Sequence, residues 1–585
     1  MTASEAVGSE AVDGSPDRVD VSARADVVGG ADVTGQFDVV VVGAGFAGMY
    51  MLHRLRRRGL TVRVIEAGTD VGGTWYWNRY PGARCDVPSM EYSYSFSEEL
   101  QQDWEWSEVM SAQPEILDYA RHVAERFDLR SDIEFATRVS SAVYDEAENR
   151  WTISTDGGDC YTCTYAIMAT GALSAANTPD IAGLDQFRGE VLHTGTWPKE
   201  PVELAGKRVG VIGTGSSGVQ AIPVLAEQAE HLYVFQRTPV YTFPARNKAL
   251  RPDIQAAYKA NYAEVRDRQR HSVAGFSGFN PKRVIEADSA GRDGGADKPV
   301  KAKRAPRPQI VDASPEERLE ALERYSFGVF NVYADVYKDE QANELARELY
   351  EHKVHELVAD PVVADALSPQ DYPLGCKRQV LDTGYYETFN RDDVTLVDLR
   401  RDPLIEITEA GIRTEAGEIE LDVIVLATGF DAMTGALDRM DIRGRGGRPL
   451  REKWEHGPVA YLGLAMEGFP NLFTITGPGS PSVLSNVIVS IEHHVDWITE
   501  CIDVLRAEGV STFEPEAQAE QQWVRHVSEV AADTMYTSPN CGSWYLGSNI
   551  PGKERIFMPY VGGVGRYRDR CEEIAANGYE GFVKR

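Results

Sequence analysis

The stretch Phe37-Asp-Val-Val-Val-Val-Gly-Ala-Gly-Phe-Ala-Gly48 is an apolar run that passes directly into a glycine pattern. The run is typical of a central parallel strand, and a helix is predicted after the last glycine. In a dinucleotide-binding unit the first two glycines allow a tight turn beside a pyrophosphate, and the third lets helix and strand pack. A second strand, residues 62–65, ends at Glu66, whose carboxylate can accept hydrogen bonds from ribose hydroxyls. Residues 37–66 therefore predict a dinucleotide site.

A second copy of this unit contains the turn Gly213-Thr-Gly-Ser-Ser-Gly218. Its spacing to Gln236 equals the spacing of the first unit from its first glycine to its terminal glutamate. Gln236 is not acidic, and Arg237 and Thr238 follow it. Since a carboxylate would repel a 2′-phosphate and an arginine can pair with one, the first unit favours FAD and the second favours NADPH over NADH. The alternative for Arg237 is an ordinary solvated arginine.

Length and charge restrict the class of protein. A chain of 585 residues with 43% hydrophobic content predicts a globular protein of two or three domains. Its 60 basic and 90 acidic residues give a net charge of −30, which argues against a nucleic-acid or anionic-membrane partner. No apolar run approaches the length of a membrane span, and no signal pattern opens the chain.

The seven cysteines are few and scattered, so they predict no disulfide framework and favour a reducing cytoplasm. Cys160 and Cys163 form a CxxC pattern without a second pair or a histidine at metal spacing. We therefore interpret them as two cysteines in a strand or turn, and we predict no metal site.

The pattern of segments predicts an α/β protein with two Rossmann-like domains. Two buried strands end in Ala-Thr-Gly, at residues 165–171 and 423–429, where the chain is expected to pass between the domains. Residues 1–36 lack aromatic residues and predict a flexible extension. The expected parts are the first FAD part at 37–175, the first NADPH part at 176–250, a helical insertion at 251–345, the second NADPH part with its linker at 346–427, and the second FAD part at 428–585.

Within the insertion, residues 256–269 and 314–327 have helical spacing. Ser314-Pro-Glu-Glu317 predicts a capping box with proline at the first helical position. A basic run at residues 298–307 is interpreted as a surface loop rather than an anion-binding lid.

The linker between the two glycine turns reads Phe187-Arg-Gly-Glu-Val-Leu-His-Thr-Gly-Thr-Trp-Pro198. It resembles the F-x-G-x-x-x-H-x-x-x-W-P fingerprint of the type I Baeyer–Villiger monooxygenases. Residues 72–86 resemble a second motif of that family, G-G-x-W-x-x-x-x-Y-P-G-x-x-x-D, which ends at Asp86. The resemblance implies that His193 holds the geometry of the linker and transfers no proton in the chemical step.

Three further positions follow from this resemblance. In Leu374-Gly-Cys-Lys377-Arg378, Lys377 is implied to contact the 2′-phosphate of NADPH and Arg378 to be the active-site arginine. A guanidinium stays protonated at any working pH, so it can stabilise an anionic oxygen nucleophile and the oxyanion of a tetrahedral adduct. Asp86 is implied to position Arg378, so we expect the two to be in contact. Trp544 is implied to lie on a mobile segment that folds over NADP.

The resemblance also assigns the binding positions. For FAD these are Gly43, Gly45, Phe46, Gly48, Glu66, Gly73, Thr74, Trp75, Asp86, Tyr92, Val139 and Val487. For NADP these are Arg84, Cys85, Asp86, Gly213, Thr214, Gly215, Ser216, Ser217, Gly218, Val219, Arg237, Thr238, Lys377, Arg378 and Trp544. The implied catalytic pair is Arg378 with Asp86, and the implied linker positions are Phe187, Gly189, His193 and Trp197.

The expected activity is that of a monooxygenase which uses FAD, NADPH and O₂ to insert oxygen beside a ketone carbonyl, giving an ester or lactone. The N-terminal extension and the long insertion resemble the branch that acts on large cyclic or polycyclic ketones, here a polycyclic terpenoid ketone. The expected partners are the ketone and O₂, in a monomer or small homo-oligomer. The alternatives are a flavin monooxygenase oxidising N or S centres, a hydride-only flavin reductase, and a non-catalytic NADPH-sensing flavoprotein.

Overall fold

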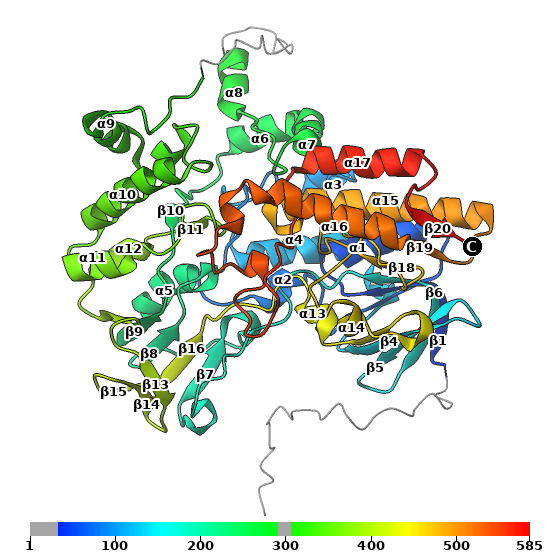
Figure 1. Cartoon of the computed structure of the whole chain (residues 1–585), viewed down its shortest axis with the longest axis horizontal. Helices are drawn as coiled ribbons and strands as arrows, with labels where there is room; N and C mark the ends of the chain where they lie inside the picture. The colour runs from blue at the N-terminus through cyan, green and yellow to red at the C-terminus, as the bar shows by residue number, and fades with distance from the viewer. Residues whose placement is uncertain (1–32, 290–305) are drawn as a thin grey trace, which may run out of the picture.

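The computed structural model describes residues 33–289 and 306–585, which form two α/β units with a helical region beside them (Figure 1). Most of the predicted N-terminal extension and most of the basic run at 298–307 lie outside the described residues. In the part of the chain that the structure describes, no helix has both the length and the apolar character needed to cross a membrane.

The first unit contains a sheet with strand order β17-β4-β5-β6-β1-β2-β3, and β18 also pairs with β6. Strand β1 pairs with β2 and β6 in parallel, as predicted for a central strand. Val39 and Val41 enter one hydrophobic core and Val40 and Val42 enter another, so both faces of the sheet are covered. The strands are β1 (Gly35–Val42), β2 (Val62–Ile65), β3 (Ile133–Glu134), β4 (Val139–Asp145), β5 (Arg150–Thr155), β6 (Cys160–Met168), β17 (Asp441–Arg443) and β18 (Leu472–Thr474).

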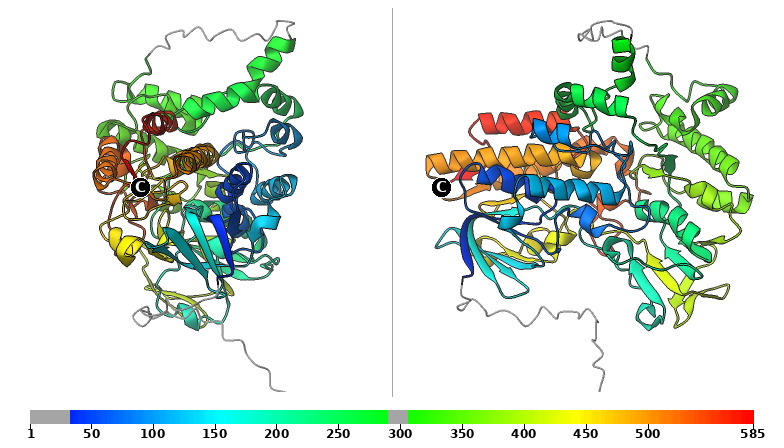
Figure 2. Two further views of the ribbon diagram at one scale, coloured as in Figure 1. Left: turned by 90° about the vertical axis from the view of Figure 1, so that its right-hand side faces the viewer. Right: turned by 180° about the vertical axis from the view of Figure 1, so that it is seen from behind.

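Most helices of the first unit lie in a layer over one face of this sheet, while two short helices pack on its other face; Figure 2 shows the unit from two further sides. The 22-residue helix α15 contacts α1 and α17 within that layer. A short antiparallel pair, β19 with β20, lies at the chain's C-terminal end. The elements are α1 (Phe46–Arg56), α2 (Thr74–Trp77), α3 (Glu98–Asp103), α4 (Gln113–Arg126), α13 (Gly435–Asp438), α14 (Leu450–Lys453), α15 (Val487–Glu508), α16 (Ala517–Ala532), α17 (Val564–Ala576), β19 (Phe513–Pro515) and β20 (Phe582–Lys584).

The second unit contains a five-stranded sheet of order β12-β9-β8-β16-β7, in which every pairing is parallel. One face of this sheet lies under α5 and the helical region, and the other lies under a three-stranded antiparallel sheet. The carboxyl ends of parallel strands share one edge, which is where ligands bind in such sheets. The elements are β7 (Glu190–His193), β8 (Arg208–Ile212), α5 (Ser216–Gln228), β9 (His231–Gln236), α12 (Tyr385–Thr388), β12 (Val394–Asp398), β13 (Leu404–Ile407), β14 (Gly411–Thr414), β15 (Glu418–Glu420) and β16 (Val423–Leu426).

The helical region begins after β10, which pairs in parallel with β11 at the region's far end. The capping box at the start of α9 is confirmed: the Ser314 hydroxyl accepts from the Glu317 amide at 3.2 Å, and the Glu317 carboxylate accepts from the Ser314 amide at 2.8 Å. The elements are β10 (Thr242–Pro244), α6 (Pro252–Ala260), α7 (Tyr262–His271), α8 (Pro281–Ser289), α9 (Pro315–Tyr325), α10 (Glu340–Leu357), α11 (Pro361–Leu367) and β11 (Val380–Asp382).

Three boundaries differ from the predictions. Strand β1 begins at Gly35 and Thr34 already donates to the Cys160 carbonyl at 2.7 Å, because strand pairing uses the backbone and needs no apolar side chains there. The predicted helix at 256–269 is two helices that meet at Asn261, whose φ of −121° is not helical. The helical region also continues past residue 345 through α11.

Candidate active site

The first glycine turn is too tight for any side chain at two of its positions. Gly43 has φ of +105°, and a Cβ placed on it would lie 2.6 Å from the Ala169 carbonyl oxygen. A Cβ on Gly48 would lie 1.8 Å from the carbonyl oxygen of Gly43, since helix α1 crosses directly over the turn. Gly45 precedes α1, and Phe46 is the first residue of that helix. This backbone is shaped to approach a pyrophosphate closely at a helix N-terminus.

Glu66 follows strand β2 and is buried. Its two carboxylate oxygens accept from the amides of Ala44 and Gly68, each at 2.6 Å. Burial raises the pKa of Glu66, and these two hydrogen bonds oppose the rise. A carboxylate has about four acceptor positions, so both oxygens can still accept from ribose hydroxyls. These residues fit the adenosine half of a dinucleotide.

The second glycine turn repeats this geometry. Gly213 has φ of +108°, and a Cβ on Gly218 would lie 2.3 Å from the Gly213 carbonyl oxygen. A Cβ on Gly215 would meet no atom within 4 Å, which leaves the space in front of helix α5 open. The Thr214 hydroxyl donates to the Thr238 carbonyl at 3.0 Å, which joins the turn to the end of β9. Ser216 and Ser217 begin α5, with Val219 buried behind them.

Two cations lie beside the end of β9. Arg237 and Thr238 are exposed there, while Gln236 is buried and donates to the Ala366 carbonyl at 2.7 Å. Lys377 lies with its Nζ 3.9 Å from the centre of the Tyr372 ring. Burial, together with the nearby charge of Arg237, lowers the pKa of Lys377 to about 8. Two cations whose charges repel each other form a site for an anion such as a 2′-phosphate.

The stretch after Glu66 packs against the first glycine turn and contributes buried aromatic rings. Gly73 has φ of +53°, and a Cβ on it would lie 2.9 Å from the Gly45 Cα. Thr74 and Trp75 then begin helix α2. Trp75 donates from its Nε1 to the Tyr92 hydroxyl at 3.1 Å, and both rings are buried. The motif therefore places a glycine in contact with the first glycine turn, and its aromatic rings are buried next to that contact.

Arg378 and Asp86 are in contact, as expected. Nε and Nη2 of Arg378 donate to Oδ2 of Asp86 at 2.9 Å and 2.6 Å. Nη1 of Arg378 donates to the Val483 carbonyl at 2.8 Å. The carboxylate of Asp86 raises the pKa of Arg378 further above its ordinary value, so the guanidinium is always charged. The cation is thus held between residues of three distant parts of the chain.

Residues 80–86 of the first unit pack on helix α5 of the second. The Gln220 side chain accepts from the Tyr80 hydroxyl at 2.9 Å and donates to the Arg84 carbonyl at 3.0 Å. A Cβ on Gly82 would lie 2.2 Å from the Gln220 carbonyl oxygen. Cys85, next to Asp86, is buried and its pKa is raised by burial. The position of Asp86 is therefore tied to the second glycine turn through α5.

His193 lies at the end of β7, between the two Ala-Thr-Gly segments. Its Nδ1 accepts from the Gly195 amide at 2.9 Å, and its Nε2 lies 3.3 Å from both the Asn177 carbonyl and the Thr428 hydroxyl. Burial lowers the pKa of His193. A neutral ring with its proton on Nε2 satisfies these contacts, which fits a residue that holds the linker.

The remaining linker positions also have packing contacts. A Cβ on Gly189 would lie 2.5 Å from the Phe187 ring and 2.4 Å from the Asp422 carbonyl oxygen. Trp197 is buried in the core of the second unit. Phe187 packs on the opposite face of the second sheet.

Three other predicted binding residues, Val139, Val487 and Trp544, lie on three different elements of the fold. Val139 begins β4 in a core on the face of the first sheet away from Trp75. Val487 begins α15, four residues after Val483. Trp544 begins a short 3₁₀ helix and packs against the same hydrophobic cluster as Val483. Sequence reasoning missed the Val483 carbonyl because a backbone acceptor carries no residue signature.

Two cysteines are paired. Cys376 and Cys541 form a disulfide with a Cα–Cα distance of 5.9 Å, across a sequence separation of 165 residues. The sequence predicted no disulfide framework and gave no sign of this bond, because the fold brings together two cysteines that lie far apart in the chain. Cys160 and Cys163 are both free on strand β6, as interpreted.

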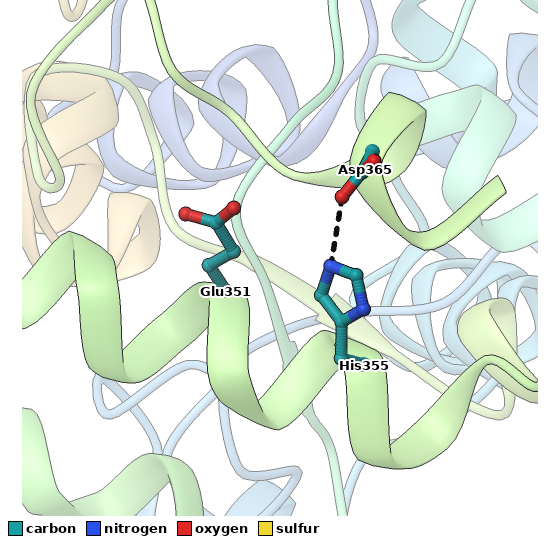
Figure 3. Close-up of side chains that lie close together, drawn as sticks. All are labelled: Glu351, His355 and Asp365. Atoms are coloured by element: carbon teal, nitrogen blue, oxygen red, sulfur yellow. Dashed lines mark hydrogen bonds and ion pairs between the residues drawn. The ribbon is translucent and has the colours of Figure 1, made fainter. Parts of the chain in front are cut away.

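Among the residues that the structure describes, one surface cluster has residue types that can bind metals: Glu351 and His355 of α10 with Asp365 of α11 (Figure 3). His355 Nε2 lies 3.0 Å from the Asp365 carboxylate. Arg347 donates to Glu351 at 3.0 Å. Each group thus has a partner within the protein at an accessible surface, so the cluster is a set of surface hydrogen bonds and carries no metal assignment.

Nearly the whole chain is similar to several known proteins. A family model described as pyridine nucleotide-disulphide oxidoreductase matches residues 40–288. The acetone monooxygenase (methyl acetate-forming) of Gordonia sp. (strain TY-5) is 41% identical over 553 residues, 93% of this chain and 98% of the relative. A Baeyer–Villiger monooxygenase of Pseudooceanicola batsensis is 41% identical over 556 residues, 94% of this chain and 96% of the relative.

Among solved structures, an oxidized steroid monooxygenase bound to NADP is 49% identical, with a TM-score of 0.83. The match covers 94% of this chain and 99% of that chain. The two glycine turns, the paired Arg378 and the extent of these likenesses lead to one family. The chain belongs to the type I Baeyer–Villiger monooxygenases, FAD- and NADPH-dependent enzymes that act on ketones.

Proposed function

We propose that this enzyme oxidises polycyclic ketones to lactones, with Arg378 as the catalytic cation and Asp86 as the residue that holds it. The observation that carries the proposal is the guanidinium fixed by the Asp86 carboxylate and the Val483 carbonyl. The guanidinium lies between Asp86, in the unit with the first glycine turn, and Val483, in the loop that leads into α15. This arrangement presents a permanent positive charge in a partly buried site.

The residues present fit both cofactors. Gly43, Gly48 and Glu66 would hold FAD, and Gly213, Gly218 and the Arg237–Lys377 pair would hold NADPH. When bound, FAD supplies the transfer of one oxygen atom from O₂ and NADPH supplies the electrons. The protein's part is to orient the ketone, exclude water and stabilise charge.

Arg378 acts on the negative charge that develops on the carbonyl oxygen when the ketone is attacked. Its guanidinium cannot lose its proton, because the adjacent carboxylate raises its pKa, so it serves as an electrostatic donor and not as an acid. Asp86 uses one oxygen to accept two N–H groups, which fixes the plane of the guanidinium. Such preorganised donors stabilise the transition state without reorganising during the reaction.

The surroundings of Arg378 favour an apolar substrate. Val483, whose carbonyl accepts from Arg378, packs in a cluster with Met433, Met558 and Trp544. Apolar side chains around a few polar groups are typical of small-molecule sites. The steroid monooxygenase among the similar structures also has a polycyclic compound in its name. Within this class we propose the terpenoid ketone 1-deoxy-11-oxopentalenate, oxidised to pentalenolactone D or neopentalenolactone D.

The test is turnover under ¹⁸O₂ with a panel of a steroid ketone, 1-deoxy-11-oxopentalenate, cyclohexanone and a thioether. We expect lactones from the polycyclic ketones that carry one heavy oxygen, with kcat/KM above that for cyclohexanone. The substrate proposal is wrong if cyclohexanone is preferred. If the thioether alone is oxidised, oxidation of an N or S centre is the better assignment.

Cofactor binding should depend on pH through Lys377. Its pKa of about 8 in the free protein means that it loses its charge as the pH rises above 8. A 2′-phosphate binds the protonated form, so the KM for NADPH should rise by up to about tenfold per pH unit above pH 8. The KM for NADH, which lacks this phosphate, should stay nearly constant. Steady-state kinetics with both cofactors from pH 7 to 9.5 measure the difference.

The matched controls for this prediction are Lys377→Arg and Lys377→Ala. An arginine stays protonated, so Lys377→Arg should remove the rise above pH 8. Lys377→Ala should weaken NADPH binding at every pH and leave NADH binding unchanged. Equal pH dependence for both cofactors in the unmodified enzyme would show that Lys377 does not bind the phosphate.

A further inference from the structure

The disulfide joins two stretches that the reaction uses. Cys376 directly precedes Lys377 and Arg378, and Cys541 lies three residues before Trp544. Both cysteines are buried, in one hydrophobic core that also contains Leu374, Tyr545 and Leu546. The bond is therefore a covalent link between the loop that carries Arg378 and the segment that carries Trp544 and Tyr545.

That segment, residues 538–558, brings a second residue to the cation. Tyr545 is buried, and the charge of Arg378 acts on its hydroxyl and opposes the rise in pKa that burial causes. The hydroxyl in turn favours the charged state of Arg378. Trp544, the preceding residue, packs against the same hydrophobic cluster as Val483, whose carbonyl accepts from Arg378. The position of the segment thus decides what surrounds the guanidinium.

Two groups of side-chain hydrogen bonds help to hold the segment. Asn549 donates to the Phe430 carbonyl at 2.8 Å, and Lys553 donates to the Thr434 hydroxyl at 2.6 Å. Arg555 donates to the carbonyls of Ser538 and Cys541, at 2.6 Å and 3.2 Å, which folds the segment on itself. The first group anchors the far half of the segment after Trp544. The near half is paired with the far half by backbone hydrogen bonds from Met558 to Tyr545 at 2.9 Å and from Ile556 to Leu546 at 3.1 Å, and the disulfide joins it to the Arg378 loop.

We propose that Cys376 and Cys541 are a thiol–disulfide site that controls closure of this segment over Arg378. In the oxidised protein the bond holds Trp544 and Tyr545 at the cation; in the reduced protein the near half of the segment opens. The inference rests on the proposed role of Arg378 for its effect on turnover. The existence of the bond and its control of the segment do not rest on that role.

The reductant is a dithiol, either a small molecule or a protein with a CxxC pair. One of its thiolates attacks a sulfur of the bridge, the Cys376–Cys541 bond breaks, and a mixed disulfide forms. The second thiol of the reductant displaces the remaining cysteine. The products are two protein thiols and one oxidised dithiol, a balanced transfer of two electrons and two protons. Pro539, Asn540 and Gly542 are exposed beside Cys541, so this end is the accessible one after local opening.

The test uses the full-length FAD-loaded protein, oxidised or treated with dithiothreitol. Peptide mapping without reductant should recover a cross-linked peptide with both cysteines. Hydrogen exchange of amides in residues 541–546 should become roughly tenfold faster after reduction, because removing a cross-link lowers the cost of local opening. Absence of the cross-linked peptide from the oxidised sample, or unchanged exchange after reduction, would overturn the proposal.

Variants give a matched comparison. Cys376→Ser and Cys541→Ser should show the fast exchange of the reduced protein and lose their response to dithiothreitol. Cys501→Ser, at a buried and unpaired cysteine of α15, should keep the response. A response that persists in the Cys541→Ser protein would contradict the proposal. If either serine variant does not fold, the comparison of oxidised with reduced unmodified protein decides the matter.

A second readout separates this inference from the proposed function. In the reduced protein we expect more hydrogen peroxide released per NADPH consumed, because an open segment admits water to the site. An unchanged ratio together with faster exchange would overturn closure over Arg378, while ketone oxidation itself stays intact. Loss of ketone oxidation in every sample would instead contradict the proposed function. Hydrogen exchange of residues 541–546 would then still test whether the disulfide controls the segment.

Discussion

Replacing Arg378 with alanine is expected to lower the rate of lactone formation by about a hundredfold or more, because one preorganised electrostatic donor is removed. Oxidation of NADPH should continue, since the residues that fit NADPH at the second glycine turn are unchanged. The electrons should then appear as hydrogen peroxide instead of product. Product formation, NADPH consumption and peroxide are measured together in one assay.

Two controls separate charge from geometry at this position. Arg378→Lys keeps the charge but cannot donate from two nitrogens to Asp86 while a third reaches Val483, so it should recover only part of the lost rate. Asp86→Asn keeps an acceptor of the same shape and removes the negative charge, so it should be milder than Asp86→Ala. Lactone formation at the normal rate by Arg378→Ala would remove Arg378 from the catalytic role.

Replacing Gly48 with alanine is expected to yield protein without bound flavin. The added Cβ would lie 1.8 Å from the Gly43 carbonyl oxygen, and neither atom belongs to a flexible side chain. Overpacking commonly costs about 1–3 kcal/mol, and this contact is between backbone and Cβ, so the turn that approaches the pyrophosphate must move. The ratio of flavin absorbance to protein after purification measures the loss.

The same change at Gly218 gives a matched comparison. Its Cβ would lie 2.3 Å from the Gly213 carbonyl oxygen, so the second turn is disturbed and the first is not. Gly218→Ala should keep its flavin and raise the KM for NADPH by about tenfold or more, since each 1.4 kcal/mol is a factor of about ten. Gly157→Ala, whose Cβ would meet its nearest atoms at 3.8 Å, should change neither property. Flavin loss in all three variants would point to general destabilisation instead.

Much of the fold was predictable because its signals are local. The glycine turns, the strands β1, β2, β8 and β9 and the capping box at Ser314 depend on residues within a few positions of one another. The break between α6 and α7 was missed because both halves have helical spacing. The extra strand residues before Phe37 were missed because backbone pairing with β6 has no composition signal.

For the site, too, one part was predictable from the sequence and another part was not. The resemblance of short motifs implied the roles of Arg378, Asp86 and Lys377, and a guanidinium and an ammonium group suit an oxyanion and a phosphate. Their arrangement in space could not be derived from local sequence, because Arg378 and Asp86 are 292 residues apart and Arg378 and Val483 are 105 residues apart. No local pattern reports a backbone carbonyl or the direction in which a guanidinium lies.

The sequence by itself determined the two glycine-turn units and the use of FAD and NADPH, and it predicted the residue types of the site, because steric limits on glycine turns and strand periodicity act over short spans. Only the tertiary structure decided that the Cys376–Cys541 bond joins the cation's loop to the covering segment, and that α5 holds residues 80–86. These contacts depend on how the two sheets pack after the chain leaves the first unit and returns to it. That packing is the sum of many weak long-range contacts, which no single stretch of sequence contains.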